Sequence, residues 1–200
     1  MTAPSPLRLG VLVSGTGSNL QAILDAITQG TLNARVELVI SNRPGVQALE
    51  RARAAGVRAL TISHKEFAQR EAFDKALVNA LREAEVNWIV LAGFMRVLTP
   101  HFLAAFPGRI INIHPSLLPA FPGVDAVKQA FDYGVKLTGC TVHFVDQGVD
   151  SGRIIAQRAV PVEASDDLAA LGARIHGAEH SVFVEVLRDI AAGRVLPFEG

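Results

Sequence analysis

One apolar run ends in two polar side chains that could carry out proton-transfer chemistry. The stretch Arg109-Ile-Ile-Asn-Ile-His-Pro places Asn112 and His114 two residues apart, and Pro115 ends the run. Alternate side chains of a strand share a face, so Asn112 and His114 point the same way, roughly 7 Å apart. Histidine can carry a proton near neutral pH, and an amide can donate to a developing oxyanion. The spacing alone leaves open a histidine that is hydrogen-bonded in a structural corner.

A turn further along the chain supplies carboxylates. Asp146 and Asp150 stand in or beside a turn that Gly148 and Gly152 make sharp. A carboxylate near His114 would orient the imidazole and favour its charged form. From the residues alone, both aspartates can equally be ordinary turn residues with Asx-type hydrogen bonds, and this interpretation is the simpler one.

A glycine-rich loop, Ser14-Gly-Thr-Gly-Ser-Asn19, separates the first strand-like run from the first helical one. Its glycines let backbone N–H groups approach an anion, and a helix N-terminus favours negative charge. Ser18 or Asn19 can cap the helix or donate to phosphate. Leu20 stands where a dinucleotide fingerprint has its third glycine, and no Gly-Lys-Ser follows. The loop therefore favours one phosphate over a pyrophosphate, while a tight turn that binds nothing stays open.

The other histidines give weaker signals. His143 lies inside a strand-like run and is interpreted as a hydrogen-bonded structural histidine. His64 and His101 lie near helix starts and are expected at the surface. His176 and Glu179, spaced i, i+3 on the last helix, are either a ligand pair or part of a solvated face, and the face is the simpler interpretation.

The single cysteine, Cys140, argues against metal chemistry. Cys140 lies in an apolar run and is expected to be a small buried side chain, not a nucleophile. One cysteine cannot form a thiolate site. We expect no metal site.

Alternating strands and helices must hold these groups. Buried strands are predicted at Leu7–Val13, Val36–Ile40, Val57–Ile62, Val86–Leu91 and Arg109–Ile113. Helical stripes lie between them, with apolar residues at Leu20, Ile23, Leu24 and Ile27, and at Phe73, Ala76, Leu77, Ala80, Leu81 and Ala84. This alternation predicts a mostly parallel sheet covered on both faces. Catalytic groups in such sheets gather at the carboxyl ends of the strands, where Asn112 and His114 fall.

The pattern changes after Tyr133. Leu137–Asp146 and Arg153–Val162 are strand-like runs with only a turn between them, which predicts an antiparallel pair. A last helix is predicted from about Ser165, where Ser-Asp-Asp supplies an N-cap and an acidic first turn, to about Ile190. The predicted fold is a single α/β domain over residues 1–200, Rossmann-like, with helices on both faces and an antiparallel C-terminal portion.

Composition narrows the partners. The chain has 200 residues, and half of them are apolar. Its 19 basic residues balance its 19 acidic ones, so the net charge gives no indication of binding to nucleic acid or anionic membranes. One cysteine excludes an internal disulfide and suits a reducing compartment. Met1 to Arg8 do not resemble a signal peptide, and no apolar run reaches the roughly 18 to 20 residues that span a bilayer. We expect a soluble cytoplasmic protein.

Four segments together closely resemble the folate-dependent formyltransferase family, and within it the enzymes that act on glycinamide ribonucleotide. They are Ser14–Ala22, Val90–Leu98, Ile111–Pro119 and Gly139–Gly152, in matching order over nearly the whole chain. The Asn-Ile-His-Pro-Ser-Leu-Leu-Pro segment is shared by several folate-dependent formyl transferases and hydrolases, whereas the Gly-Ser-Asn loop is more particular to the ribonucleotide enzymes. Thr16 and the Asp146-Gln-Gly turn depart from the forms typical of the family.

The resemblance implies transfer of a formyl group from 10-formyltetrahydrofolate to the amine of 5'-phosphoribosylglycinamide, in de novo purine biosynthesis. It implies catalysis by Asn112, His114 and Asp150. It implies a ribonucleotide site of Gly15, Thr16, Gly17, Ser18, Asn19, His176 and Glu179. It implies a folate site of Arg70, Met95, Arg96, Val97, Leu98, Asn112, Asp146, Gln147, Gly148, Val149 and Asp150.

It also implies a division of labour and a set of partners. Residues of about 1–100 would bind the ribonucleotide phosphate, and residues of about 101–200 would bind folate and catalyse. Formyltetrahydrofolate is a cosubstrate, and no bound cofactor or metal is expected. The partners are small molecules, without nucleic acid or membrane, and the chain is expected to be a monomer or a homodimer.

Four other functions compete with this interpretation. A formyltetrahydrofolate hydrolase could use the same trio with water as acceptor. A methionyl-tRNA formyltransferase shares the trio, but it has an additional RNA-contacting domain, and the neutral charge disfavours tRNA. A nicotinamide-dependent dehydrogenase is disfavoured by Leu20 in the loop. A non-catalytic nucleotide-binding module is the remaining alternative.

Overall fold

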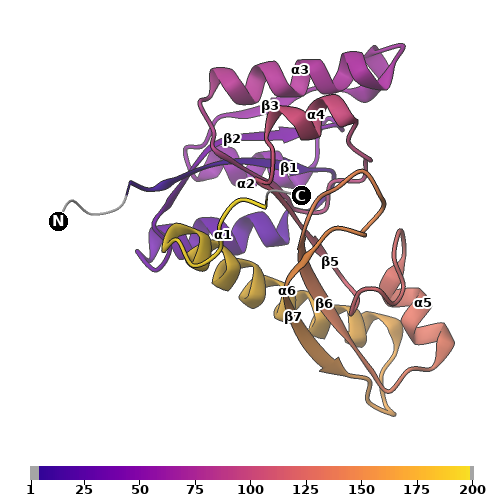
Figure 1. Ribbon diagram of the computed structural model, residues 1–200. Coiled ribbons are helices and arrows are strands. Elements are labelled where there is room, and N and C mark those ends of the chain that lie inside the picture. Colours follow the sequence, from indigo (N-terminus) through magenta and orange to yellow (C-terminus); the bar gives the residue numbers. More distant parts are fainter. Residues whose placement is uncertain (1–4, 199–200) are drawn as a thin grey trace.

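A computed structural model describes residues 5–198 as one seven-stranded sheet with helices on both faces (Figure 1). Met1–Pro4 and residues 199–200, which the expected domain includes, lie outside the described residues. The strands are β1 (Leu7–Val13), β2 (Ala34–Ser41), β3 (Ala59–Thr61), β4 (Trp88–Leu91), β5 (Ile110–His114), β6 (Leu137–Phe144) and β7 (Ile154–Pro161). The helices are α1 (Ser18–Thr28), α2 (Gln47–Ala54), the 3-10 turn η1 (His64–Glu66), α3 (Arg70–Glu83), α4 (Pro100–Ala105), α5 (Ala126–Tyr133) and α6 (Leu168–Ala191).

The strand order is β3-β2-β1-β4-β5-β6-β7. The pairs from β3 to β5 are parallel, and β6 pairs antiparallel with β5 and with β7. The predicted fold class, including its antiparallel C-terminal portion, is confirmed. The order of the strands along the chain reverses between β1 and β4. Ligands of open α/β sheets bind at such a reversal, beyond the carboxyl ends of the strands.

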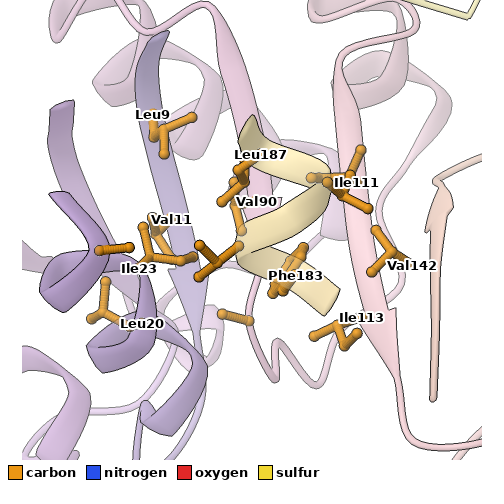
Figure 2. Packing of buried hydrophobic residues seen from close by; sticks show 14 of the residues in the cluster. Leu9, Val11, Leu20, Ile23, Val90, Ile111, Ile113, Val142, Phe183 and Leu187 are labelled. Atoms are coloured by element: carbon orange, nitrogen blue, oxygen red, sulfur yellow. The ribbon is translucent and has the colours of Figure 1, made fainter. Parts of the chain in front are cut away.

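Side chains that alternate along the strands build a core on each face of the sheet. On one face, Phe183 and Leu187 of α6 pack with strand residues such as Val11, Val90 and Ile111 (Figure 2). Helices α1 and α2 contribute to the same core. On the other face α3 and α4 cover a second cluster around Leu12 of β1 (Figure 1). The two cores fix the sheet between rigid layers.

The ends of several strands differ from the predicted ones. β2 begins at Ala34 because it pairs with β1 along the whole length of that strand. β3 is shorter than predicted, because Val57 bonds back to Ala52 of α2 and pairing with β2 begins only at Ala59. Within residues 5–198, no helix is both long and apolar enough to cross a membrane, although α6 has 24 residues.

The position of Phe183 predicts a large effect on stability. Its side chain is 1% exposed, so Phe183→Ala loses buried apolar surface and leaves a cavity. We expect the free energy of unfolding to fall by about 3 to 5 kcal/mol, measured by urea denaturation as a lower midpoint at unchanged slope. The control Leu196→Ala removes an exposed side chain and should change the free energy by less than about 0.5 kcal/mol. Equal losses in the two variants would contradict this packing.

Candidate active site

A cleft of about 1010 Å³ opens at the carboxyl ends of β1, β4 and β5. Of the residues singled out in the sequence, it is lined by Gly15, Thr16, Gly17, Ser18, Asn19, Met95, Arg96, Val97, Leu98, Asn112, His114, Asp146, Gly148, Val149, Asp150, His176 and Glu179. Arg70 and Gln147 are not among the lining residues. Segments from both ends of the chain therefore meet in one cavity, at the reversal of the strand order.

Asp150 lies at the centre of the polar cluster in this cleft. Its Oδ2 is 3.3 Å from His114 Nδ1 and accepts a hydrogen bond from the Gly123 N–H at 2.8 Å. Its Oδ1 accepts from Asn112 Nδ2 at 3.4 Å. The backbone of Asp150 has φ 52°, a left-handed conformation that is strained for a residue other than glycine. Asp150 is thus more than an ordinary turn residue, because its contacts draw three segments together.

The surroundings of Asp150 favour its ionised form. Burial opposes the charge, but the hydrogen bond with His143, the Gly123 N–H and the charges of His114 and His143 outweigh it. The pKa of Asp150 is therefore lowered from its ordinary value. A carboxylate that stays charged can hold a protonated imidazole beside it.

Both ring nitrogens of His114 face acceptors. Nε2 lies 2.8 Å from the carbonyl oxygen of Phe121, which can only accept, so Nε2 carries a proton. Nδ1 faces the Asp150 carboxylate, which also accepts. Phe121, like Asp150, has a left-handed backbone, with φ 53°. The loop after β5 therefore helps to orient the histidine from the side opposite to the aspartate.

His143 belongs to this cluster, and the interpretation of it as a purely structural histidine was incomplete. The register pairs His143 of β6 directly with Asn112 of β5. Nδ1 of His143 lies 2.8 Å from the Phe144 carbonyl and therefore donates to it. Nε2 lies 3.2 Å from Asn112 Nδ2 and 3.6 Å from Asp150 Oδ1. Only the pairing register between two strands could have revealed this neighbour, and the sequence does not give that register.

The glycine-rich loop leads into α1 without a side-chain cap. Gly17 occupies the cap position with φ 73°, and neither Ser18 nor Asn19 caps the helix as the sequence had allowed. Gly17 also packs against α2, since a Cβ at this position would lie 2.6 Å from the Ala48 Cβ. The first N–H groups of α1 consequently have no side-chain acceptor, an arrangement that favours an anion.

Glu179 lies beside this loop and not on a solvated face. It is 3% exposed, and its Oε2 accepts from Asn19 Nδ2 at 3.2 Å and bonds to His176 Nδ1 at 2.8 Å. The Glu179 bond raises the pKa of His176, although burial partly opposes the shift. The buried Oδ1 of Asn19 has no hydrogen-bond partner. The simpler interpretation, a solvated face, is therefore wrong for Glu179, whereas the His176 side chain is 55% exposed; both residues line the cleft.

Most of the residues assigned to folate line the cleft, whereas Arg70 does not. Met95 and Val97 expose apolar side chains at the cleft, and Arg70 donates to the Val97 carbonyl at 2.8 Å. Asp146 lines the cleft, yet its Oδ1 accepts from the Gly148 N–H and the Ser151 hydroxyl, as an ordinary turn aspartate does. Arg70 thus holds the backbone of the Met95–Leu98 segment without lining the cleft itself.

Outside the cluster, Cys140 is buried, and burial raises the pKa of its thiol to about 12, as expected for an inert side chain. His101 is exposed, whereas His64 is half-buried against Asn42, so its predicted surface position was only partly right. No group of three or more His, Cys, Asp or Glu side chains among residues 5–198 could hold a metal ion.

The sheet, the loop and the cluster define an α/β protein whose cleft is lined by a glycine-rich loop and by groups that can transfer protons. A family model described as formyl transferase matches residues 7–187. The chain belongs to the formyl transferase family.

Its relatives include proteins of purine metabolism. Phosphoribosylglycinamide formyltransferase of Bacillus subtilis is 42% identical over 92% of this chain and 94% of its own length. Trifunctional purine biosynthetic protein adenosine-3 of Drosophila melanogaster is 53% identical over 94% of this chain, which spans only 14% of that longer protein. The crystal structure of glycinamide ribonucleotide transformylase 1 from Symbiobacterium toebii has a TM-score of 0.94 at 50% identity, over 98% of this chain and 92% of that one.

The pair of His176 and Glu179 predicts a shifted titration. Because the carboxylate raises the pKa of His176, Glu179→Gln should move the His176 midpoint to lower pH, as followed by NMR. The stabilisation of the folded state by the His176–Glu179 pair is complete below the ordinary histidine pKa of about 6.5. It is lost as pH rises through the higher pKa that His176 has in the folded protein. Glu185→Gln on the same helix is the control, since Glu185 pairs with Arg158 instead. An unchanged His176 midpoint in Glu179→Gln would contradict the pairing.

Proposed function

We propose that this chain transfers the formyl group of 10-formyltetrahydrofolate to the amine of 5'-phosphoribosylglycinamide, in cytoplasmic purine biosynthesis. One observation carries the proposal. The glycine-rich loop after β1 and the cluster of Asn112, His114 and Asp150 border the same cleft. An acceptor anchored by its phosphate at the loop would extend its amine toward the cluster. The names of the relatives of similar length support the same activity.

The ribonucleotide end of the cleft is proposed at Gly15–Asn19. Backbone N–H groups at the uncapped start of α1 would bind the phosphate, with the helix dipole favouring its charge. His176 and Glu179 would meet the part of the acceptor beyond the phosphate. The proposed ligand sites cross the expected division into halves, since Glu179 belongs to the second half and Met95–Leu98 to the first.

The folate end is proposed at Met95–Leu98 and the turn around Val149. Met95, Val97 and Val149 expose apolar surface at the cleft, which suits a flat ring system. Arg96 lines the same cleft and would attract the carboxylates of the folate tail. The cosubstrate would leave as tetrahydrofolate after each transfer.

The proposed chemistry needs no enzyme nucleophile. The acceptor amine attacks the formyl carbon, a C–N bond forms, and the carbonyl oxygen becomes an oxyanion. Collapse of this intermediate breaks the bond to the folate nitrogen. The amine loses one proton and the departing folate nitrogen gains one, so the transfer is balanced without a redox partner or a metal. Preorganised donors at the oxyanion would supply most of the acceleration.

Asn112 and His114 are the proposed donors. Asn112 Nδ2 donates to Asp150 Oδ1 at 3.4 Å, which is a long and weak contact. That hydrogen is the one a substrate oxyanion would redirect. To donate to the substrate oxygen or relay a proton, His114 would exchange one of its two acceptors, the Asp150 carboxylate or the Phe121 carbonyl. Asp150 would orient the imidazole or order a water for the transfer.

The decisive assay separates the proposal from its rivals. We expect formyl transfer from 10-formyltetrahydrofolate to glycinamide ribonucleotide, measured as release of tetrahydrofolate that depends on the acceptor. Equal release without acceptor would indicate a hydrolase. Formylation of methionyl-tRNA instead of the ribonucleotide would indicate the tRNA enzyme. Binding of the ribonucleotide without turnover would indicate a non-catalytic module.

Replacing Asp150 tests the catalytic cluster. Asp150→Asn keeps the shape of the side chain but removes the charge that faces His114. We expect kcat to fall by about 10² to 10⁴, the usual range for losing positioned proton-transfer help, with the ribonucleotide KM nearly unchanged. Asp132→Asn removes a carboxylate from an exposed ion pair on α5 and is the matched control. If the two variants have the same kcat, Asp150 has no catalytic role.

Replacing Gly17 tests the phosphate loop. Gly17→Val introduces side-chain atoms at φ 73° and against Ala48, so the loop and the start of α1 must shift. We expect the ribonucleotide KM to rise strongly while the folate KM changes little. Gly30→Val is a matched control, because Gly30 has φ 69° but nothing within 4 Å of an added Cβ. A parallel rise of both KM values in Gly17→Val would place the phosphate elsewhere.

A further inference from the structure

A buried hydroxyl connects the two proposed ends of the cleft. Ser14 follows β1 and directly precedes Gly15, and its side chain is 3% exposed. The backbone N–H of Met95 donates to Ser14 Oγ at 2.9 Å. Met95 begins the Met95–Leu98 segment proposed for folate. One side chain thus bridges the start of the phosphate loop and the start of the folate segment.

The direction of the Ser14 hydroxyl is fixed by Asn42. Ser14 Oγ donates to Asn42 Oδ1 at 2.6 Å, and both side chains are buried. A hydroxyl has one hydrogen, so its lone pairs are left for Met95. Asn42 follows β2, and its Nδ2 lies 3.3 Å from His64 Nδ1. His64 therefore helps to hold the side-chain amide of Asn42 in place. The side chains of Ser14 and Asn42 in turn join the carboxyl ends of β1 and β2.

Met95 lies beyond the backbone hydrogen bonds that pair its segment with β1. The Ala92 N–H still bonds to the Leu12 carbonyl of β1 at 3.0 Å. The chain then turns at Gly93, whose φ of 75° directs it away from the strand. The chain lines the cleft on both sides of this turn, and the Met95–Leu98 segment forms its later part. Its first N–H bonds to a serine side chain in place of a neighbouring strand, so the position of the segment depends on that side chain.

We infer that Ser14 is a positioning residue for folate binding, which sets the Met95–Leu98 segment relative to the ribonucleotide phosphate loop. The inference rests on the proposed function, because it uses the assignment of that segment to folate. Ser14 acts through the backbone of Met95 and needs no contact of its own with either substrate.

The test is Ser14→Ala in the full-length protein. We expect the KM for 10-formyltetrahydrofolate to rise roughly three- to tenfold, the factor that corresponds to losing one hydrogen bond. The ribonucleotide KM and kcat should change less. Ser41→Ala is a matched control, because Ser41 is equally buried at the end of β2 and its Oγ accepts from the backbone N–H of Arg43. A general loss of stability would affect both variants alike.

Hydrogen exchange gives a second readout that activity does not influence. The Met95 amide should exchange faster in Ser14→Ala than in wild type, and unchanged in Ser41→Ala. Asn42→Ala leaves the Ser14 hydroxyl but frees its direction, so a smaller change in the same sense is expected. This variant decides the question if Ser14→Ala does not fold. Folate KM and Met95 exchange equal to those of Ser41→Ala would overturn the inference.

The two levels of the proposal can fail separately. Titration of wild type with tetrahydrofolate, together with the transfer assay, tests the proposed function alone. If wild type neither binds tetrahydrofolate nor transfers formyl, the function is wrong. If wild type does both and Ser14→Ala behaves as Ser41→Ala does, only the positioning role of Ser14 is wrong.

Discussion

The need to satisfy a half-buried carboxylate governs the geometry of the cleft. Asp150 remains charged because separate segments supply its partners: β5 through Asn112 and His114, the following loop through Gly123, and β6 through His143. A carboxylate away from water is stable only with such partners. The antiparallel placement of β6 beside β5 and the course of the loop must therefore be kept together, even though the two strands are separated by more than twenty residues of sequence.

Much of the fold could be predicted because apolar runs report burial directly. Leu7–Val13 matches β1 residue for residue, and the short turn between the last two strands correctly indicated their antiparallel pairing. The order of strands in the sheet could not be predicted, since it depends on helix packing between distant segments. The ends of β3 were overestimated for a related reason: Val57 is apolar, but it bonds to the end of α2 and not to β2.

Site residues whose neighbours lie on the same strand could be predicted, whereas contacts between residues of two different elements could not. Asn112 and His114 followed from the alternation of a single strand. His143 was missed because its partner lies across the sheet. The burial of Glu179 was not expected from the residues alone, because a polar residue on a helix is normally solvated. Burial of Glu179 requires both the Asn19 amide and His176, and only the fold brings Asn19 within reach.

Helix α6 connects the core to the cleft along one stripe. Glu179, Phe183 and Leu187 are spaced four residues apart, so they lie on the same side of the helix, with the carboxylate one turn before the aromatic side chain. Adding or removing one residue between positions 179 and 183 would rotate one part against the other by about 100°. The side chains that α6 contributes to the core, or those that it contributes to the cleft wall, would then point in another direction. An insertion between these positions would consequently disrupt the protein far more than an insertion in the loops that border the helix.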